Sequence, residues 1–243
     1  MSRARPATGR RMIGGLAVAA VAAAAPPAAA AADEPPTRPS LTNGATTAQI
    51  VAATHARARP GAGRRIARVA TVTSWSGHAQ RLLVLAARDD WVKVRLPIRP
   101  NGTAAWVPRD KVVLRRERHW IRLRLATRRI TVYRDGRRLR SFRAVIGAPG
   151  TPTPRGLHAI YERNRQPDPG GFLGPWSLSL TALSNVLESF GGGPGRVAIH
   201  GREGASLRDP LGSARSHGCV RIDSRAVRWL ARHARPGTPV DVR

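Results

Sequence analysis

Apolar residues fall in short runs between residues 66 and 113, and turn-forming residues separate the runs. The runs are Ile66–Val69, Arg81–Leu85, Trp91–Leu96 and Ala105–Val107. Runs rich in valine, leucine, isoleucine and tryptophan indicate strands, and several short strands at close spacing are typical of a small barrel. We therefore expect a small β-barrel over residues 48–117.

A second series of apolar runs begins near Arg118. Trp120–Leu125 alternates apolar and polar residues with a period of two, which indicates a strand with one buried face. Ile130–Tyr133 and Leu139–Ile146 flank Asp135-Gly136, and this dipeptide predicts a hairpin with a type I′ turn. These runs predict a second β-rich unit over residues 118–243.

A helical pattern occurs near the end of this unit. Asp223 or Ser224 can cap a helix, because a short polar side chain accepts hydrogen bonds from the first free N–H groups. Apolar residues then recur at helical spacing, at Ala226, Val227, Leu230 and Ala231. Gly237 and Pro239 are expected to end the helix. The chain is thus predicted to be mostly β, with few helices.

The first residues predict export. Arginines between residues 3 and 11 precede an apolar run that starts at Met12 and ends in alanines, which is the pattern of a cleavable signal peptide over residues 1–32. Pro26-Pro27 interrupts the run too early for a membrane-spanning helix, so we expect no stable membrane span after cleavage. The Arg10-Arg11 pair leaves a twin-arginine signal as a minor alternative. The expected location is the cell wall or the extracellular or periplasmic space.

Residues 33–47 are rich in proline and polar residues and poor in apolar ones. Such a segment cannot bury enough apolar surface to fold, so it predicts a flexible tether. The predicted order is therefore a signal peptide, a tether, a small barrel and a second β-rich unit.

The net charge of +28 requires anionic surroundings, because 42 Lys and Arg residues face only 14 Asp and Glu residues. Nucleic acid, acidic lipid and an anionic cell wall all meet this requirement. The sequence has no basic recognition helix, zinc-finger pattern or interleaved stacking aromatics, so nucleic acid is not the expected partner. The arginines are scattered, which is typical of a solvated surface. An exported basic protein is expected to contact the anionic cell wall.

The single cysteine, Cys219, is the first candidate for chemistry. An exported protein with one cysteine cannot use it for an internal disulfide. Val220 and Ile222 alternate as in a strand directly after it, so the backbone there is expected to be rigid. Gly218 has no side chain, and the N–H groups of Gly218 and Cys219 are therefore candidates for an oxyanion hole.

The second candidate is His200, at the end of the short apolar run Arg196–His200. A loop from Gly201 to Arg215 separates this run from the cysteine segment and can bring His200 back beside Cys219. A thiol is a strong nucleophile only as the thiolate, so a base must take its proton. Imidazole, with a pKa of about 6.5, suits that proton transfer at neutral pH.

Together, His200-Gly201 and Ser216-His217-Gly218-Cys219-Val220-Arg221 resemble the signature of the L,D-transpeptidases. Residues 147–156 are similar to that family's strand-connecting loop, and residues 190–195 resemble its approach to the histidine strand. The resemblance covers residues 118–243 and implies a β-sandwich catalytic domain. Residues 90–108 resemble bacterial SH3-like wall modules, in which Trp91 and Trp106 form either a ligand groove or simply part of the core.

The resemblance to L,D-transpeptidases implies roles for these residues. Cys219 is the expected nucleophile and His200 the proton acceptor and donor, oriented by backbone near Gly201. Ser216 and His217 are expected to shape the pocket. Arg221 stands where the family often has Asn, and it is a candidate for binding a stem carboxylate.

The resemblance also implies the substrate and inhibitor classes. The substrates would be peptidoglycan stem peptides, which form cross-links through a thioester, with a stem amine, a protein amine or water as the acceptor. Carbapenems would acylate the same thiol, and no cofactor is required.

Two other functions remain open at this point. Cys219, His200 and His217 could bind zinc, although their spacing is poor for a zinc site. Alternatively, the chain is a catalytically inactive wall-binding protein, in which residues 48–113 bind and the positive charge supplies affinity.

Overall fold

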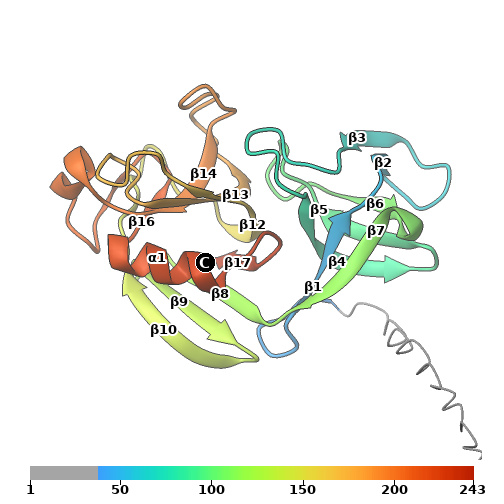
Figure 1. Cartoon of the computed structure of the whole chain (residues 1–243), viewed down its shortest axis with the longest axis horizontal. Coiled ribbons are helices and arrows are strands. Elements are labelled where there is room, and N and C mark those ends of the chain that lie inside the picture. The colour runs from blue at the N-terminus through green and yellow to red at the C-terminus, as the bar shows by residue number, and fades with distance from the viewer. Residues whose placement is uncertain (1–37) are drawn as a thin grey trace, which may run out of the picture. The chain divides into compact units, whose positions relative to one another are not determined.

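The computed structural model describes residues 38–243, which belong to one compact unit (Figure 1). The predicted signal peptide, residues 1–32, and the first part of the predicted tether, residues 33–37, lie outside the described residues. Within the described part, no helix combines the length and the hydrophobicity needed to cross a membrane.

The first half of the described chain forms a seven-stranded sheet, in the order β3-β2-β6-β5-β4-β1-β7. Its strands are β1 (Ala45–Ile50), β2 (Thr54–Arg57), β3 (Arg65–Val69), β4 (Arg81–Arg88), β5 (Trp91–Arg95), β6 (Ala104–Pro108) and β7 (Val112–Glu117). A short 3-10 helix, Arg109–Lys111, precedes β7. The four strands expected from the apolar runs correspond to β3, β4, β5 and β6.

The first strand begins earlier than the sequence predicted. β1 starts at Ala45, inside the predicted tether, so the folded part begins before residue 48. Ala45 pairs with Glu117 of β7, and Ala48 pairs with Leu82 of β4. Small and polar residues fill this strand, so it lacks the apolar run that marks the other strands. Pairing on both sides, rather than intrinsic propensity, stabilises it.

The seven-stranded sheet has its own hydrophobic core, but the pairings within residues 38–243 do not join its end strands, β3 and β7. Val92 and Val94 of β5 point into this core. Trp91 and Trp106 lie outside the core cluster and are half-buried, because they alternate with the core residues along β5 and β6. The SH3-like identity of this sheet stays a prediction.

The second half forms an eight-stranded sheet, in the order β10-β9-β8-β17-β12-β13-β14-β16. Its strands are β8 (His119–Arg124), β9 (Arg129–Arg134), β10 (Arg137–Arg143), β12 (Gly156–Arg165), β13 (Trp176–Leu183), β14 (Arg196–His200), β16 (Val220–Arg221) and β17 (Pro239–Val242). β11 (Ile146–Gly147) and β15 (Ala214–Ser216) form a separate parallel pair. The described chain is mostly β, as predicted.

The helix and the hairpin confirm the local sequence signals. In the turn between β9 and β10, Asp135 and Gly136 have φ values of 49° and 76°, the positive pair that a type I′ turn requires. The helix α1 spans Ser224–His233, and the Asp223 side chain accepts hydrogen bonds from the N–H groups of Arg225 and Ala226. β10 ends at Arg143, so Ile146 belongs to β11 instead.

The end of α1 differs from the prediction. The helix stops at His233, where Ala234 takes an extended conformation, and neither Gly237 nor Pro239 is its terminator. Gly237 instead has φ +93° and donates its N–H to the carbonyl of Ile160. Pro239 begins β17, the strand between β8 and β12.

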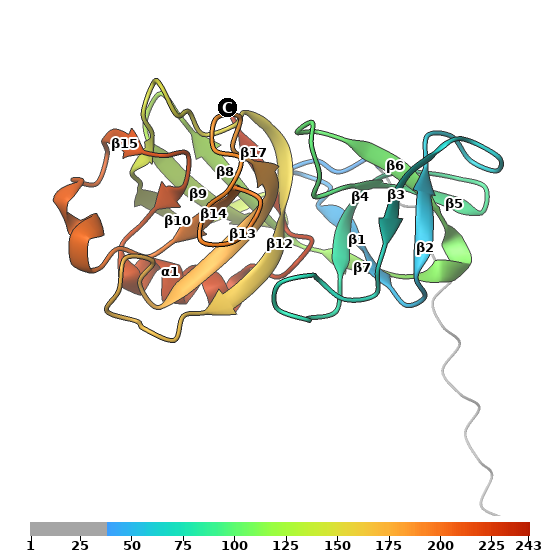
Figure 2. The ribbon, with the colours of Figure 1, turned by 90° about the horizontal axis from the view of Figure 1, so that it is seen from above.

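One hydrophobic cluster joins both ends of the eight-stranded sheet with α1, consistent with the expected sandwich. Residues from β8 and β9 and residues from β13 and β14 pack in the same cluster as Val227 and Leu230 of the helix. Figure 2 shows the sheet from above, with the strands β12, β13 and β14 next to one another. The edge formed by β14 and β16 carries the residues singled out from the sequence.

The turn between β5 and β6 of the seven-stranded sheet holds a loop of the eight-stranded sheet. Arg99 donates hydrogen bonds to the carbonyls of Ser184, Leu187 and Pro194, at 3.1 Å each. Asn101 exchanges hydrogen bonds with the backbone of Leu183, at 2.7 and 2.8 Å. We call residues 184–195 the β13–β14 loop. Its conformation therefore depends on side chains from the first half of the chain.

Candidate active site

Two adjacent parallel strands bring the predicted histidine and cysteine together. His200 ends β14, and Cys219 directly precedes β16. The strands pair in parallel, with His200 opposite Arg221, and Ile222 donates its N–H to the His200 carbonyl. His200, His217, Cys219 and Arg221 line one small pocket, which we call the histidine pocket. The predicted return of His200 to the side of Cys219 is thus confirmed.

Ser216 holds the turn that presents Cys219. Its hydroxyl donates to the Cys219 carbonyl at 2.5 Å and accepts the Gly218 N–H at 3.2 Å. Gly218 has φ +109°, a conformation that residues with a Cβ rarely adopt. The predicted role of Ser216 in shaping the site is therefore a backbone role, because its side chain is buried and bonded within the turn.

The loop after β11 secures the same turn from the other side. Thr153 donates its hydroxyl to the Gly218 carbonyl at 2.9 Å and accepts the Gly147 N–H. Thr151 donates its hydroxyl to the Ser216 carbonyl at 2.9 Å. These hydrogen bonds fix the cysteine turn without using the thiol, which remains free for chemistry.

Of the two N–H groups predicted to form an oxyanion hole, those of Gly218 and Cys219, one already has a hydrogen-bond partner. The Gly218 N–H is engaged by the Ser216 hydroxyl, so it does not point freely at a substrate. The Cys219 N–H makes no hydrogen bond among residues 38–243. Of the two predicted donors, the Cys219 N–H is the one without a partner in the described structure, and its oxyanion role stays a prediction.

His200 is held as a neutral base. It is buried, and its Nδ1 lies 2.8 Å from the Gly201 carbonyl. A carbonyl only accepts hydrogen bonds, so Nδ1 carries the proton and Nε2 keeps its lone pair. Burial, aided by the positive charge of Arg221, lowers the pKa of His200 to about 4, although the Gly201 and Leu173 backbone acts in the opposite direction. The ring is thus uncharged at neutral pH.

The Cys219 thiol is also neutral before substrate binds. Burial raises the pKa of Cys219, while the Ala198 N–H and the charge of Arg221 act in the opposite direction. A raised thiol pKa beside a lowered imidazole pKa disfavours a resting thiolate and imidazolium pair. Both groups are therefore uncharged in the resting site.

Gly201 has a packing role in addition to its carbonyl. A Cβ at this position would lie about 3.0 Å from Pro175 and Ser224 and 3.1 Å from Val227. A larger residue would push β14 away from α1 and move His200. The glycine after the histidine is therefore required by the close approach of the helix.

Arg221 is engaged inside the protein. It is buried, and its Nη1 donates to the Asp209 carboxylate in an ion pair. Its guanidinium lies 4.7 Å from the centre of the Phe172 ring, and that ring lies 5.9 Å from the ring of His200. These contacts order the wall of the histidine pocket. Binding of a stem carboxylate by Arg221 stays a prediction, and one nitrogen of its guanidinium already pairs with Asp209.

His217 is exposed and lines the histidine pocket. Its position in the turn matches the expectation that it shapes the mouth of the site. Its ring is not part of the hydrogen bonds that fix the turn, which come from Ser216, Thr151 and Thr153.

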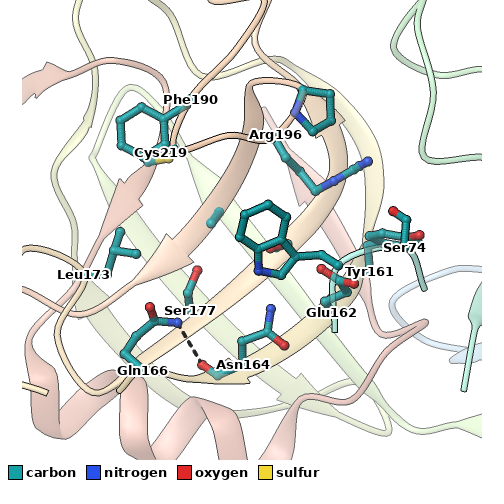
Figure 3. A pocket seen from close by; sticks show the side chains of 16 residues that line it. Ser74, Tyr161, Glu162, Asn164, Gln166, Leu173, Ser177, Phe190, Arg196 and Cys219 are labelled. Atoms are coloured by element: carbon teal, nitrogen blue, oxygen red, sulfur yellow. Dashed lines mark hydrogen bonds between the residues drawn. The ribbon is translucent and has the colours of Figure 1, made fainter. Parts of the chain in front are cut away.

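A larger pocket of about 210 Å³ also has Cys219 in its lining (Figure 3). We call it the peptide pocket. Polar side chains of β12, β13 and the residue after β12 line it, namely Glu162, Asn164, Gln166, Ser177 and Ser179. The two pockets adjoin, because Leu173, Phe190, Arg196 and Cys219 line both of them.

The first half of the chain contributes residues to this pocket that the sequence did not predict. Ser74 and Trp75 line it, and Ser76 donates its N–H and its hydroxyl to the buried carboxylate of Glu162 at 3.2 and 3.1 Å. Glu162 could have been singled out from the sequence, because acidic residues are rare in this basic chain. Ser74–Ser76 carry no such signal, because only the fold brings them close.

The described residues offer no support for zinc binding. Among residues 38–243, no group of three or more His, Cys, Asp or Glu side chains is arranged to hold a metal ion. Cys219 and His200 are close, but the third residue of the proposed zinc set, His217, is not grouped with them in that way.

Comparison with known proteins identifies residues 118–242 as an L,D-transpeptidase catalytic domain of the YkuD family. A curated relative, the putative L,D-transpeptidase YkuD of Bacillus licheniformis, is 34% identical over 122 residues. That alignment covers 50% of this chain and 64% of the relative, so this chain spans less than two thirds of the relative's length.

Solved structures resemble the chain more distantly. Bd1075 of Bdellovibrio bacteriovorus is 25% identical, with 52% of this chain and 48% of that chain covered and a TM-score of 0.40. An L,D-transpeptidase of Mycobacterium tuberculosis is 15% identical, with coverages of 68% and 90% and a TM-score of 0.43. The L,D-transpeptidase LdtMt1, solved with imipenem, is 16% identical, with coverages of 70% and 76% and a TM-score of 0.43. The family match spans just over half of the 243 residues, and the chain belongs to the L,D-transpeptidase catalytic domain family.

Proposed function

We propose that this protein is an exported L,D-transpeptidase that cross-links peptidoglycan stem peptides through a thioester on Cys219. The observation that carries the proposal is the neutral pair at the β14–β16 edge. Cys219 and His200 line one pocket, and the Gly201 carbonyl fixes the proton on Nδ1 of the imidazole. That arrangement supports general-base activation of the thiol.

In the first half of the reaction, Nε2 of His200 accepts the thiol proton while the sulfur attacks the carbonyl carbon of the third stem residue. The Cys219 N–H faces the oxygen that becomes negative. His200 then gives the proton to the leaving amine, the C–N bond breaks and the terminal D-alanine departs. A thioester between Cys219 and the stem remains.

In the second half, an amine of a neighbouring stem attacks the thioester carbonyl and loses its proton to His200. The C–S bond breaks, the new amide forms, and the proton returns to the Cys219 sulfur. Water in place of the amine would give carboxypeptidase activity. The larger pocket, of about 210 Å³, reaches Cys219 and is the space proposed for the stem that the thiol attacks.

The same thiol is expected to react with carbapenems, which would open their lactam ring on Cys219. A matched L,D-transpeptidase was solved with imipenem, which makes this class a reasonable probe. The support in this chain itself is the half-buried thiol, free of internal hydrogen bonding in its turn.

Incubation of the protein with a soluble stem tetrapeptide tests the proposed reaction. We expect release of D-alanine together with a cross-linked dimer, both detected by mass spectrometry, because the site holds the nucleophile and its base together. A matched stem with D-configuration at the third residue should not react. If the L-centred stem yields neither free D-alanine nor a dimer, the inactive wall-binding alternative is favoured. D-alanine without a dimer would show hydrolysis in place of cross-linking.

Export is proposed from the first residues alone. Arginines between residues 3 and 11 and the apolar run after Met12 are typical of a cleavable signal. The mature protein should begin between about residues 27 and 33, which N-terminal sequencing of wall-associated protein would measure. Recovery of the chain with Met1 intact in the cytoplasmic fraction would contradict export.

A further inference from the structure

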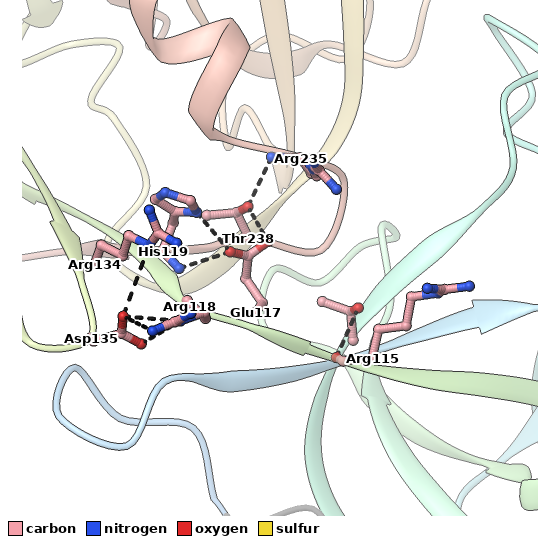
Figure 4. A network of polar contacts seen from close by, with 9 residues as sticks. Arg115, Glu117, Arg118, His119, Arg134, Asp135, Arg235 and Thr238 are labelled. Atoms are coloured by element: carbon pink, nitrogen blue, oxygen red, sulfur yellow. Dashed lines mark hydrogen bonds and ion pairs between the residues drawn. The ribbon is translucent and has the colours of Figure 1, made fainter. Parts of the chain in front are cut away.

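A third cavity, lined by none of the residues of the two pockets around Cys219, is dominated by arginine. Figure 4 shows the polar contacts around Glu117 in its lining. The cavity has a volume of about 330 Å³. We call it the arginine cavity. Seven arginines line it: Arg81, Arg115, Arg116, Arg118, Arg134, Arg232 and Arg235. It shares no lining residue with either pocket at Cys219, so the catalytic chemistry does not account for it.

The one carboxylate in the lining is already satisfied by other groups. Glu117 is buried, and its Oε1 accepts the His119 backbone N–H at 2.7 Å and lies 3.1 Å from His119 Nδ1. Its Oε2 accepts the Thr238 hydroxyl at 3.0 Å. These hydrogen bonds lower the pKa of Glu117 against the effect of burial, so the group is ionised. No arginine of the cavity makes an ion pair with it in the described structure.

A nearby carboxylate neutralises only part of the lining. Asp135 pairs with Arg118 at 2.6 Å and lies 3.9 Å from Arg134. Arg81 donates to the neutral amide of Gln49. The other four arginines of the lining make no ion pair within residues 38–243. They are Arg115, Arg116, Arg232 and Arg235. The cavity therefore holds several positive charges without a counterion from the described protein.

A further polar atom beside the cavity lacks a partner. His119 Nδ1 faces Glu117, while its Nε2 is buried without a hydrogen-bond partner in the described structure. His233 also lines the cavity, and its ring lies 6.0 Å from that of His119. Concentrated like charges cost free energy unless an anion offsets them. The arrangement thus favours a ligand with more than one negative group.

The chemistry of the lining indicates phosphate. Guanidinium groups match phosphate oxygens with paired N–H donors and stay charged at any physiological pH. No Trp, Tyr or Phe lines the cavity, so it lacks the stacking surfaces with which proteins bind the bases of single-stranded nucleic acid. Because residues of both sheets line the cavity, a polymer chain can enter it. A flat bilayer would contact only the residues at its opening. We propose that the arginine cavity binds a linear phosphodiester polymer that carries no bases.

Binding of poly(glycerol phosphate) to the full chain tests this site, measured by isothermal titration calorimetry at two salt concentrations. The triple variant Arg116→Gln, Arg232→Gln and Arg235→Gln removes three exposed charges that make no ion pair in the described structure. We expect the affinity to fall at least about tenfold and the salt dependence to weaken, because each lost arginine removes a phosphate contact.

The matched control removes three exposed arginines elsewhere, by Arg59→Gln, Arg64→Gln and Arg65→Gln on the β2–β3 hairpin. Its net charge equals that of the cavity variant, and its affinity should fall less than about threefold. An equal loss in both variants would overturn the proposal, because net charge alone would then explain binding. The proposal is also overturned if phosphatidylglycerol vesicles or an oligonucleotide of equal phosphate number bind as tightly and lose as much affinity in the cavity variant. Single substitutions at Arg116 and Arg235 keep the test valid if the triple variant does not fold.

Discussion

Replacing Cys219 with alanine is expected to abolish the covalent adduct that a carbapenem forms with this protein. Cys219 is the only cysteine in the chain, and it lies at the boundary of both pockets. No neighbouring side chain in the turn can replace the sulfur, because the Ser216 hydroxyl is bonded to the Cys219 carbonyl. Intact-mass spectrometry after incubation should show one adduct on the wild type and none on the variant.

Two controls make this loss interpretable. Cys219→Ser keeps a side chain of similar size, and it should fold with an unchanged melting temperature while reacting far more slowly. Ser224→Ala changes another hydroxyl close to Gly201 without touching the thiol, so its adduct should still form. An adduct that persists undiminished in Cys219→Ala would rule out the proposed nucleophile.

Replacing His200 with asparagine is expected to slow acylation roughly 10²- to 10⁴-fold, the usual range for loss of a general base. Asparagine can still donate to the Gly201 carbonyl from the position of Nδ1, but it has no lone pair at the position of Nε2. The comparison therefore separates proton transfer from structural support. Stopped-flow measurement of acylation gives the rate, and a loss below about threefold would contradict the role of His200.

The pH profile gives an independent reading of the same residue. Protonation of His200 stops it from accepting the thiol proton, so the rate falls as the pH drops through the pKa of the ring. Burial places that pKa at about 4, and the wild-type rate should therefore hold nearly constant from pH 7 to about pH 5. A decline centred near pH 6.5 would mean that the ring is not desolvated. The asparagine variant should recover rate only in alkaline solution, where thiolate forms without a base.

The residues of the chemical centre were predictable because their signals are local. Cys219 and its neighbours form one contiguous motif, and His200 ends a short apolar strand, so the sequence alone predicted that the two residues lie together. Their partners are distant in sequence. The Arg221–Asp209 ion pair and the Ser76–Glu162 hydrogen bonds depend on how loops return to the sheet. For that reason the sequence left Arg221 as a substrate-binding candidate and did not reveal the contribution of Ser76.

Two interior strands of the eight-stranded sheet, β12 and β13, were not predicted, for a different reason. β12 has five consecutive buried residues, His158–Glu162, and β13 is buried over most of its length. A strand covered on both faces does not alternate apolar and polar residues. In β12 the buried run also contains a histidine and a glutamate, so it lacks the apolar signature of a core strand. The hydrogen bonds of Glu162 to Ser76 make its burial possible.

The segment that is homologous to other proteins is shorter than the segment that folds together. Homology begins at residue 118, yet Glu117 is buried against Thr238, and Arg99 and Asn101 hold the β13–β14 loop through its backbone. That loop carries Phe190, which lines both pockets at Cys219. A catalytic domain separated from residues 38–117 would therefore lose the side chains that restrain its own β13–β14 loop.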